Sequence, residues 1–215
     1  MMTLVKFDVG SIFVTIEIGN LFLFRSLQKM AIETEKKYRL DKKRLVELTA
    51  KLGEMGAEFK YETFEENYLH RGGVLDELGA LLRLRKTADK TLLTYKEKLR
   101  NDADFKHKIE FETVVSDVDA TESIIEKLGY KLSVVYEKHR KAWHLGNVEI
   151  VLDELPFGYY MEIEGAIEDI EKTEKLLKVR DLEPEPRGYS RLTAKYGKEK
   201  KNGVFEARFA RQSSA

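Results

Sequence analysis

Cysteine is absent from this sequence of 215 residues. Its absence excludes disulfide bonds, zinc sites with thiolate ligands and a cysteine nucleophile. It also agrees with a reducing compartment, and we expect a cytoplasmic location. The four histidines follow no ligand spacing such as H-E-x-x-H. Any metal bound here is therefore expected to be a hard cation held by carboxylates.

A net charge and a long apolar run are also missing. The 38 lysines and arginines balance 38 aspartates and glutamates, whereas nucleic-acid-binding proteins favour a basic excess. The apolar stretch over residues 12–24 is short, and Glu17, Gly19 and Asn20 interrupt it, which argues against a membrane span. No small-residue cleavage site follows it, so a signal peptide is not expected. We expect neither nucleic acid nor a membrane as a partner.

The chain divides into a central domain and two ends of different character. Met30 stands just before the first clear strand. We interpret residues 1–29 as an N-terminal extension, which a start codon assigned too early would explain. The alternative is an extra strand or amphipathic segment on the domain surface. Residues 30–197 are expected to form one domain, and the polar residues 198–215 a flexible tail.

What the sequence has in abundance is charge, at 35% of its residues, and the charge follows a pattern. In residues 32–40 every second position from Glu33 to Arg39 is charged. Side chains alternate between the two faces of a strand, so this pattern predicts a strand with one charged face. A single strand of this kind is typical of a sheet that is solvated on one side.

The same spacing recurs in four more predicted strands. Each has two like charges separated by one residue, at Arg83/Arg85, Glu110/Glu112, Lys138/Arg140 and Glu162/Glu164. A helical pattern that ends near Gly or Pro follows each Glu-x-Glu strand, which indicates a weak internal repeat. We therefore predict an α+β fold, a closed antiparallel eight-stranded β-barrel with helices packed outside. Apolar side chains would face these helices, and the charges would face the lumen.

Glutamates directed into one lumen would repel one another. Two like charges about 4 Å apart cost about 4 kcal/mol at an effective dielectric constant of about 20. A divalent metal would offset this cost, and carboxylates on one side with Arg and Lys on the other suit a metal-bound polyphosphate. The alternative is a set of cross-strand ion pairs on a solvated sheet.

The charged strands also carry a resemblance to a known family. Residues 33–37, Glu-Thr-Glu-Lys-Lys, match the E-x-E-x-K signature of the CYTH family, also called triphosphate tunnel metalloenzymes. Further motifs follow in the family's order, at residues 82–85 (L-R-x-R), 94–96 (a single lysine), 108–112 (R-x-E-x-E, with Lys108 in place of Arg), 138–140 (K-x-R), 151–153 (an aspartate), 160–164 (E-x-E) and 188–190. The resemblance runs from about residue 32 to residue 196 and leaves both ends unmatched.

The resemblance implies a tunnel of eight antiparallel strands that depends on Mg²⁺ or Mn²⁺. The implied metal ligands are Glu33, Glu35, Asp153, Glu162 and Glu164. The implied triphosphate ligands are Lys37, Arg83, Arg85, Lys96, Lys138 and Arg140. Glu110, Glu112 and Lys37 are the implied catalytic residues, since the two glutamates would orient the attacking water or hold a second metal. Lys98 and Lys108 are further candidates, as phosphate ligands or as salt bridges of the wall.

The implied reaction stays open within the family, which includes thiamine triphosphatases, inorganic triphosphatases and class IV adenylate cyclases. In a triphosphatase, water attacks the terminal phosphorus; in a cyclase, the ribose 3′ oxygen attacks the α-phosphorus and pyrophosphate leaves. We expect phosphohydrolysis of a nucleoside, thiamine or inorganic triphosphate, with cyclic AMP synthesis from ATP as the alternative. A non-catalytic polyphosphate-binding module is a further alternative. The protein would act as a monomer or a homodimer.

Overall fold

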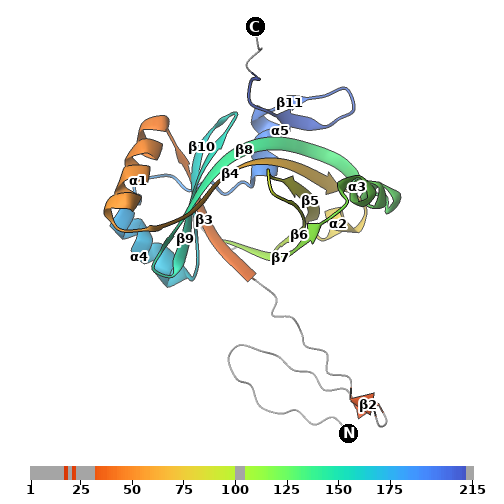
Figure 1. The fold of residues 1–215 in the computed structure, drawn as a ribbon, viewed down its shortest axis with the longest axis horizontal. Coiled ribbons are helices and arrows are strands. Elements are labelled where there is room, and N and C mark those ends of the chain that lie inside the picture. Colours follow the sequence, from red (N-terminus) through yellow and green to blue (C-terminus); the bar gives the residue numbers. More distant parts are fainter. Residues whose placement is uncertain (1–16, 19–20, 23–31, 100–104, 212–215) are drawn as a thin grey trace.

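Eight strands form a closed ring. The computed structural model describes residues 17–18, 21–22, 32–99 and 105–211, and Figure 1 shows their arrangement. Around the ring the order is β8-β4-β5-β6-β7-β3-β10-β9, every pair is antiparallel, and the pairing of β8 with β9 closes the circle. The bounds are β3 (Ile32–Leu40), β4 (Glu58–Arg71), β5 (Ala80–Lys86), β6 (Thr91–Lys98), β7 (Lys106–Val115), β8 (Lys131–Leu145), β9 (Val148–Leu155) and β10 (Gly158–Glu164). The predicted α+β fold with an eight-stranded antiparallel barrel is confirmed.

Two of the helices begin at an aspartate that caps them. Asp41 accepts a hydrogen bond from the backbone N–H of Arg44 at 2.7 Å, and Asp117 accepts one from that of Ala120 at 2.9 Å. Each Asp therefore caps a helix N-terminus. The helices are α1 (Lys42–Glu54), α2 (Val74–Glu77), α3 (Val118–Lys127), α4 (Ile167–Leu177) and α5 (Tyr189–Tyr196). No helix in the described ranges is long and apolar enough to cross a bilayer.

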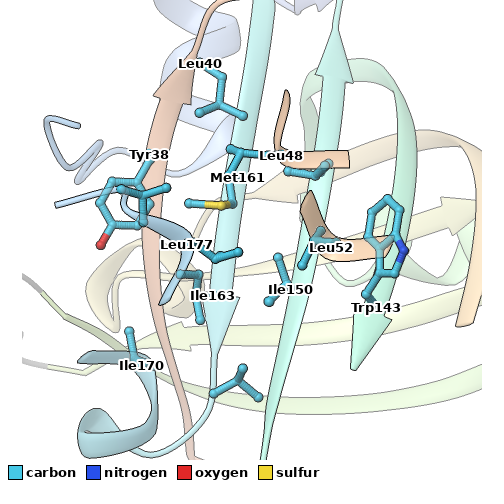
Figure 2. Close-up of a cluster of buried hydrophobic side chains, with 13 residues drawn as sticks. Tyr38, Leu40, Leu48, Leu52, Trp143, Ile150, Met161, Ile163, Ile170 and Leu177 are labelled. Carbon is cyan, nitrogen blue, oxygen red and sulfur yellow. The ribbon is translucent and has the colours of Figure 1, made fainter. Parts of the chain in front are cut away.

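The main hydrophobic core lies outside the barrel wall, where α1 and α4 cover β3, β9 and β10 (Figures 1 and 2). Met161 and Ile163 of β10 belong to it, together with Leu48 and Leu52 of α1 and Ile170 of α4. All five side chains are buried. Removing apolar surface from water contributes about 25 cal/mol per Å², so this contact fixes the two helices on the outside of the barrel.

On β10, apolar side chains point out of the barrel and charged side chains point into it, which is the reverse of the arrangement in most small domains. Met161 and Ile163 face the helices, so Glu162 and Glu164, which alternate with them, face the lumen. The predicted arrangement, with apolar side chains outside and charges inside, is therefore found on this strand.

The C-terminal segment differs from the expected flexible tail. β11 (Lys198–Glu199) and β12 (Phe205–Ala207) pair with each other, and β12 also runs parallel to residues 134–136 of β8. Figure 1 shows this hairpin beside α5. The barrel wall is thus extended by one short strand along the part of β8 that β9 does not reach.

Ion pairs and buried side chains hold this C-terminal hairpin in place. Arg208 lies 2.8 Å from Glu66 and 3.0 Å from Glu137. Val204 and Ala207 are buried. The segment is polar overall, and these few contacts leave no recognisable pattern in the sequence. The sequence pattern therefore favoured a flexible tail.

Most of the N-terminal extension lies outside the described residues. Its described parts are β1 (Glu17–Ile18) and β2 (Leu21–Phe22), which pair with each other in a separate two-stranded sheet. The interpretation of residues 1–29 as a dispensable extension therefore stays a prediction.

Candidate functional site

The lumen of the barrel holds a cavity of about 480 Å³. All eight strands of the ring and the segment over residues 186–191 contribute to its wall. Every predicted site residue except Asp153 lines it, namely Glu33, Glu35, Lys37, Arg83, Arg85, Lys96, Glu110, Glu112, Lys138, Arg140, Glu162 and Glu164. The fold thus brings together residues that are far apart in the sequence.

One wall of the cavity is basic, and glutamates of β7 hold it in place. Arg83 lies 3.4 Å from Glu110, and Arg85 lies 2.7 Å from Glu112. Lys96 also pairs with Glu110. Burial alone would raise the pKa of Glu110, but Lys96 and Arg83 lower it to about 2. These cations are fixed in direction, which suits an anion bound across them.

A second group of ion pairs joins β3, β8 and β10. Glu162 lies 2.9 Å from Lys37 and 2.7 Å from Arg140. Burial would raise the pKa of Glu162, but Lys37 and Arg140 lower it well below its usual range. Burial and Glu162 would likewise raise the pKa of Glu35, yet Lys108 and Lys37 bring it down to about 2. Both carboxylates are therefore ionised at neutral pH.

Glu33 and Glu164 behave in the opposite way. Burial raises the pKa of Glu33 to about 8, and the neighbouring Glu110 adds to the effect. Burial also raises the pKa of Glu164 to about 7, with further contributions from Glu35 and Glu162. The carboxylates at this level of the cavity are crowded, so a bound cation would lower their electrostatic cost.

The donor set fits a hard divalent cation. Glu164 of β10 is paired directly with Glu35 of β3. Glu33 and Glu162 lie two residues away from this pair, on β3 and β10 respectively. Carboxylate oxygens are the ligands that Mg²⁺ and Mn²⁺ prefer. Within the described part of the chain, no three His, Asp or Glu side chains are already gathered as a metal cluster. The fit therefore rests on donor type and on like-charge crowding.

Asp153 does not line the cavity, and its role as a metal ligand stays a prediction. Its side chain is 0% exposed and accepts hydrogen bonds from Arg140 Nε at 2.7 Å and Nη2 at 2.6 Å. The hydroxyl of Tyr189 donates a third hydrogen bond at 2.7 Å. Arg140 and Tyr189 thus engage both carboxylate oxygens of Asp153. Asp153 is the cross-strand partner of Arg140, lies on the same face of the sheet and holds the guanidinium group in position.

Sequence reasoning missed three groups at the site. Glu65 is buried, and its carboxylate lies 3.1 Å from Lys138 Nζ. No acidic residue lies two positions before or after Glu65, so it is not part of a pair of like charges separated by one residue. Lys106 lines the cavity 3.3 Å from Glu35; it continues the alternation of β7 by one step and could have been found that way. Tyr189 lies on a helix, where strand alternation gives no signal, although it belongs to the family-like segment at residues 188–190.

Comparisons with known proteins agree with this fold. A family model described as the CYTH domain matches residues 31–194. The PH1012 protein from Pyrococcus horikoshii OT3 is 25% identical, with a TM-score of 0.65 over 74% of this chain and 98% of that chain. The PH1819 protein from the same organism is 26% identical, with a TM-score of 0.63 over 76% of this chain and 99% of that chain.

A more distant structure shares the fold alone. The HpAC1 protein from Hippeastrum is 16% identical, with a TM-score of 0.59 over 75% of this chain and 93% of that chain. Among curated proteins, no match was found. Because the family model covers most of the chain, including every charged strand of the cavity, this protein belongs to the CYTH family.

Proposed function

We propose that this protein is a phosphohydrolase that depends on Mg²⁺ or Mn²⁺ and cleaves a triphosphate inside the barrel. One observation carries the proposal: the cavity in the barrel has a basic wall, fixed by ion pairs, beside a crowded set of carboxylates. A polyanion with bound cations matches both parts at once.

The basic wall would bind the phosphate groups. Arg83 and Arg85 offer planar guanidinium groups that suit phosphate oxygens, and Lys96, Lys138 and Arg140 supply further positive charge around the lumen. The two arginines already lie against Glu110 and Glu112, so the glutamates keep them oriented before substrate arrives.

The carboxylates would hold the metal. We assign this role to Glu33, Glu35, Glu162 and Glu164, and we assign Asp153 to the positioning of Arg140 instead. When bound, the divalent cation stabilises charge on the phosphoryl oxygens.

Hydrolysis needs a water molecule placed in line with the bond that breaks. Glu110 is ionised, because Lys96 and Arg83 outweigh the effect of burial and lower its pKa to about 2. Such a carboxylate accepts a hydrogen bond from water and orients it. Lys37 at 2.9 Å from Glu162 would stabilise negative charge on the substrate.

The choice of hydrolysis over cyclisation is supported by a structural relative. HpAC1, which shares the fold, is described as having a dominant triphosphatase activity. For this chain, the test is incubation with Mg²⁺ or Mn²⁺ and tripolyphosphate, thiamine triphosphate or ATP. We expect released orthophosphate and no activity after exhaustive chelation.

The products separate the alternatives. Cyclic AMP and pyrophosphate from ATP would identify a cyclase, and tight binding with no product would identify a polyphosphate-binding module. Full activity in the chelated protein would contradict the assigned role of the carboxylates.

A further inference from the structure

A buried glutamate on β4 contacts cations on both neighbouring strands. Glu65 is 1% exposed. Its carboxylate lies 3.1 Å from Lys138 Nζ on β8 and 3.7 Å from Arg85 Nη1 on β5. In the ring, β4 stands between these two strands. Glu65 therefore joins two cations that come from different strands of the barrel.

The strand registers account for both contacts. Glu65 is the direct cross-strand partner of Lys138, and Asn67, two residues further along the same face, is the partner of Arg85. Long side chains reach such diagonal neighbours as well as direct ones. Lys138 and Arg85 line the cavity, whereas Glu65 is too deeply buried to line it. Glu65 would therefore act on a ligand through these two cations.

The surrounding charges keep Glu65 ionised. Burial alone would raise its pKa, but Lys138, Arg140 and Arg85 lower it to about 2. The Nδ2 group of Asn67 donates a hydrogen bond to the same carboxylate at 3.4 Å. A charged carboxylate is thus held between the two cations at neutral pH.

Lys138 depends on Glu65 more than on its other acidic neighbour. Asp153 Oδ2 lies 3.7 Å from Lys138 Nζ, and that oxygen already accepts hydrogen bonds from Arg140 at 2.6 Å and Tyr189 at 2.7 Å. Glu65, at 3.1 Å, is the nearer carboxylate. An ammonium group has three donors, so Lys138 can keep one on Glu65 and direct the others to a bound anion.

Arg85 is held from two sides. Its Nη2 lies 2.7 Å from Glu112, and its Nη1 lies 3.7 Å from Glu65. The two carboxylates therefore fix the plane of the guanidinium group. An anion that meets cations whose directions are already set loses less affinity to the ordering of side chains.

We propose that Glu65 is a positioning residue, which fixes the directions of Lys138 and Arg85 so that cations from two strands meet the phosphoryl oxygens of the triphosphate together. This inference rests on the proposed function. Without the carboxylate, both cations would have to be ordered when the substrate binds, and that ordering reduces affinity. Backbone pairing already joins β4 to β5 and to β8, so the strands do not depend on these ion pairs.

Calorimetric titration with tripolyphosphate in the presence of Mg²⁺ tests the inference. For Glu65→Gln we expect affinity about three- to tenfold lower than in the parent, with no change in the Mg²⁺ concentration for half-maximal phosphate release. Glu65→Asp keeps the charge but shortens the side chain. It should give a smaller loss, and it carries the same test if Glu65→Gln does not fold.

Glu66→Gln is the matched control. It removes the next carboxylate of β4, which lies on the opposite face of the strand and pairs with Arg208 at 2.8 Å. This variant should bind tripolyphosphate as the parent does. Equal losses of affinity in Glu65→Gln and Glu66→Gln would indicate a general structural defect and would overturn the inference.

Double variants test whether the two cations carry the effect. The loss caused by Glu65→Gln should become smaller when Lys138→Met or Arg85→Met is already present, because one of the two cations that Glu65 positions is then missing. The same loss in every background would mean that Glu65 acts through neither cation, which also overturns the inference.

The remaining outcomes separate this inference from the proposed function. Unchanged affinity in Glu65→Gln would overturn the positioning role while triphosphate hydrolysis still stands. Tighter binding would overturn it too, because the carboxylate would then act as a negative charge that repels the substrate. If the parent does not bind tripolyphosphate, the proposed function fails and the inference fails with it.

Discussion

Arg83 and Glu35 lie on different walls of the cavity, so substitution of Arg83 should impair substrate binding and substitution of Glu35 should impair metal binding. Arg83 faces Glu110 and Glu112 on the basic wall, so Arg83→Ala should weaken triphosphate binding at every metal concentration. Glu35→Gln is nearly isosteric, and it should lower the apparent metal affinity, with partial recovery in excess Mn²⁺. A charge-assisted contact contributes about 1.5–3 kcal/mol, so each effect should exceed about tenfold.

Titrations of metal and of substrate against both variants measure this difference. Lys43→Ala, on the exposed face of α1, serves as the control. If both variants behave like the parent, Arg83 and Glu35 take no part in binding, and the tunnel is not the active site.

Asp153 and Tyr189 form a buried support for Arg140, which predicts a distinct kinetic result. Tyr189→Phe removes the hydroxyl that donates to Asp153 and keeps the ring over Lys37. We expect KM for the triphosphate to rise about three- to tenfold, while the metal concentration for half-maximal activity stays constant. Asp153→Asn should give the same split with a larger rise in KM. A shift in metal dependence for Asp153→Asn would show that Asp153 is a metal ligand after all.

Glu164 predicts how stability changes with pH in the metal-free protein. Burial and nearby carboxylates raise its pKa from 4.5 to about 7 in the folded state. Between these values the folded protein binds more protons than the unfolded chain, so this residue makes stability fall as pH rises. Above about pH 7 its contribution no longer changes. Glu33, whose pKa burial raises to about 8, acts in the same direction over a wider range.

Thermal melts of the parent and of Glu164→Gln measure this contribution. The variant should gain melting temperature relative to the parent as pH rises from about 5 to about 7. Glu62→Gln, on the exposed part of β4, should show no such trend. A constant difference between Glu164→Gln and the parent would mean that Glu164 titrates normally.

At the scale of elements, the sequence predicts the strands with regular alternation better than those without it. β3 has the predicted bounds, Ile32–Leu40. β4 spans Glu58–Arg71, and no pair of like charges separated by one residue marks it in the sequence. Its first residues are mostly exposed and gain strand structure from pairing with β8. Such pairing depends on the partner, so a local pattern does not reveal it.

The C-terminal hairpin gives a prediction at the same scale. A chain that ends after Gly197 loses β12, the buried Ala207 and the ion pairs of Arg208 with Glu66 and Glu137. We expect its melting temperature to fall by several degrees, because each loss of about 1 kcal/mol shifts the melting temperature of a domain of this size by about 2–4 °C. A chain that ends after Arg211 keeps these contacts and should melt like the full protein. Equal melting of both chains would mean that the hairpin adds no stability.

At the scale of the whole molecule, the N-terminal extension is predicted to be dispensable. The eight-stranded ring is complete from β3 onward, and the family match begins at residue 31. A chain that starts at Met30 should therefore equal the full protein in melting temperature and in phosphate release. Aggregation, or a loss of several degrees, would show that residues 1–29 belong to the fold.

The sequence also reveals more of the site's composition than of its geometry. The pairs of like charges separated by one residue identify the residues of the cavity wall, because side chains two positions apart on a strand lie on one face. Alternation does not show that Asp153 is fully buried and paired with Arg140, since both residues lie on the same face of the sheet. Tyr189, which the fold brings from α5, also contacts Asp153.

The closure of the ring has a consequence for the order of events during synthesis. β3 is the first strand of the barrel to leave the ribosome, yet Leu40 pairs with Tyr159 on β10, the last. Until β10 is available, β3 lacks one neighbour and the lumen charges stay in water. Contacts so distant in sequence slow folding, and an unfinished sheet presents open edges to other chains. The nascent barrel is thus most exposed to misassembly between the emergence of β3 and that of β10.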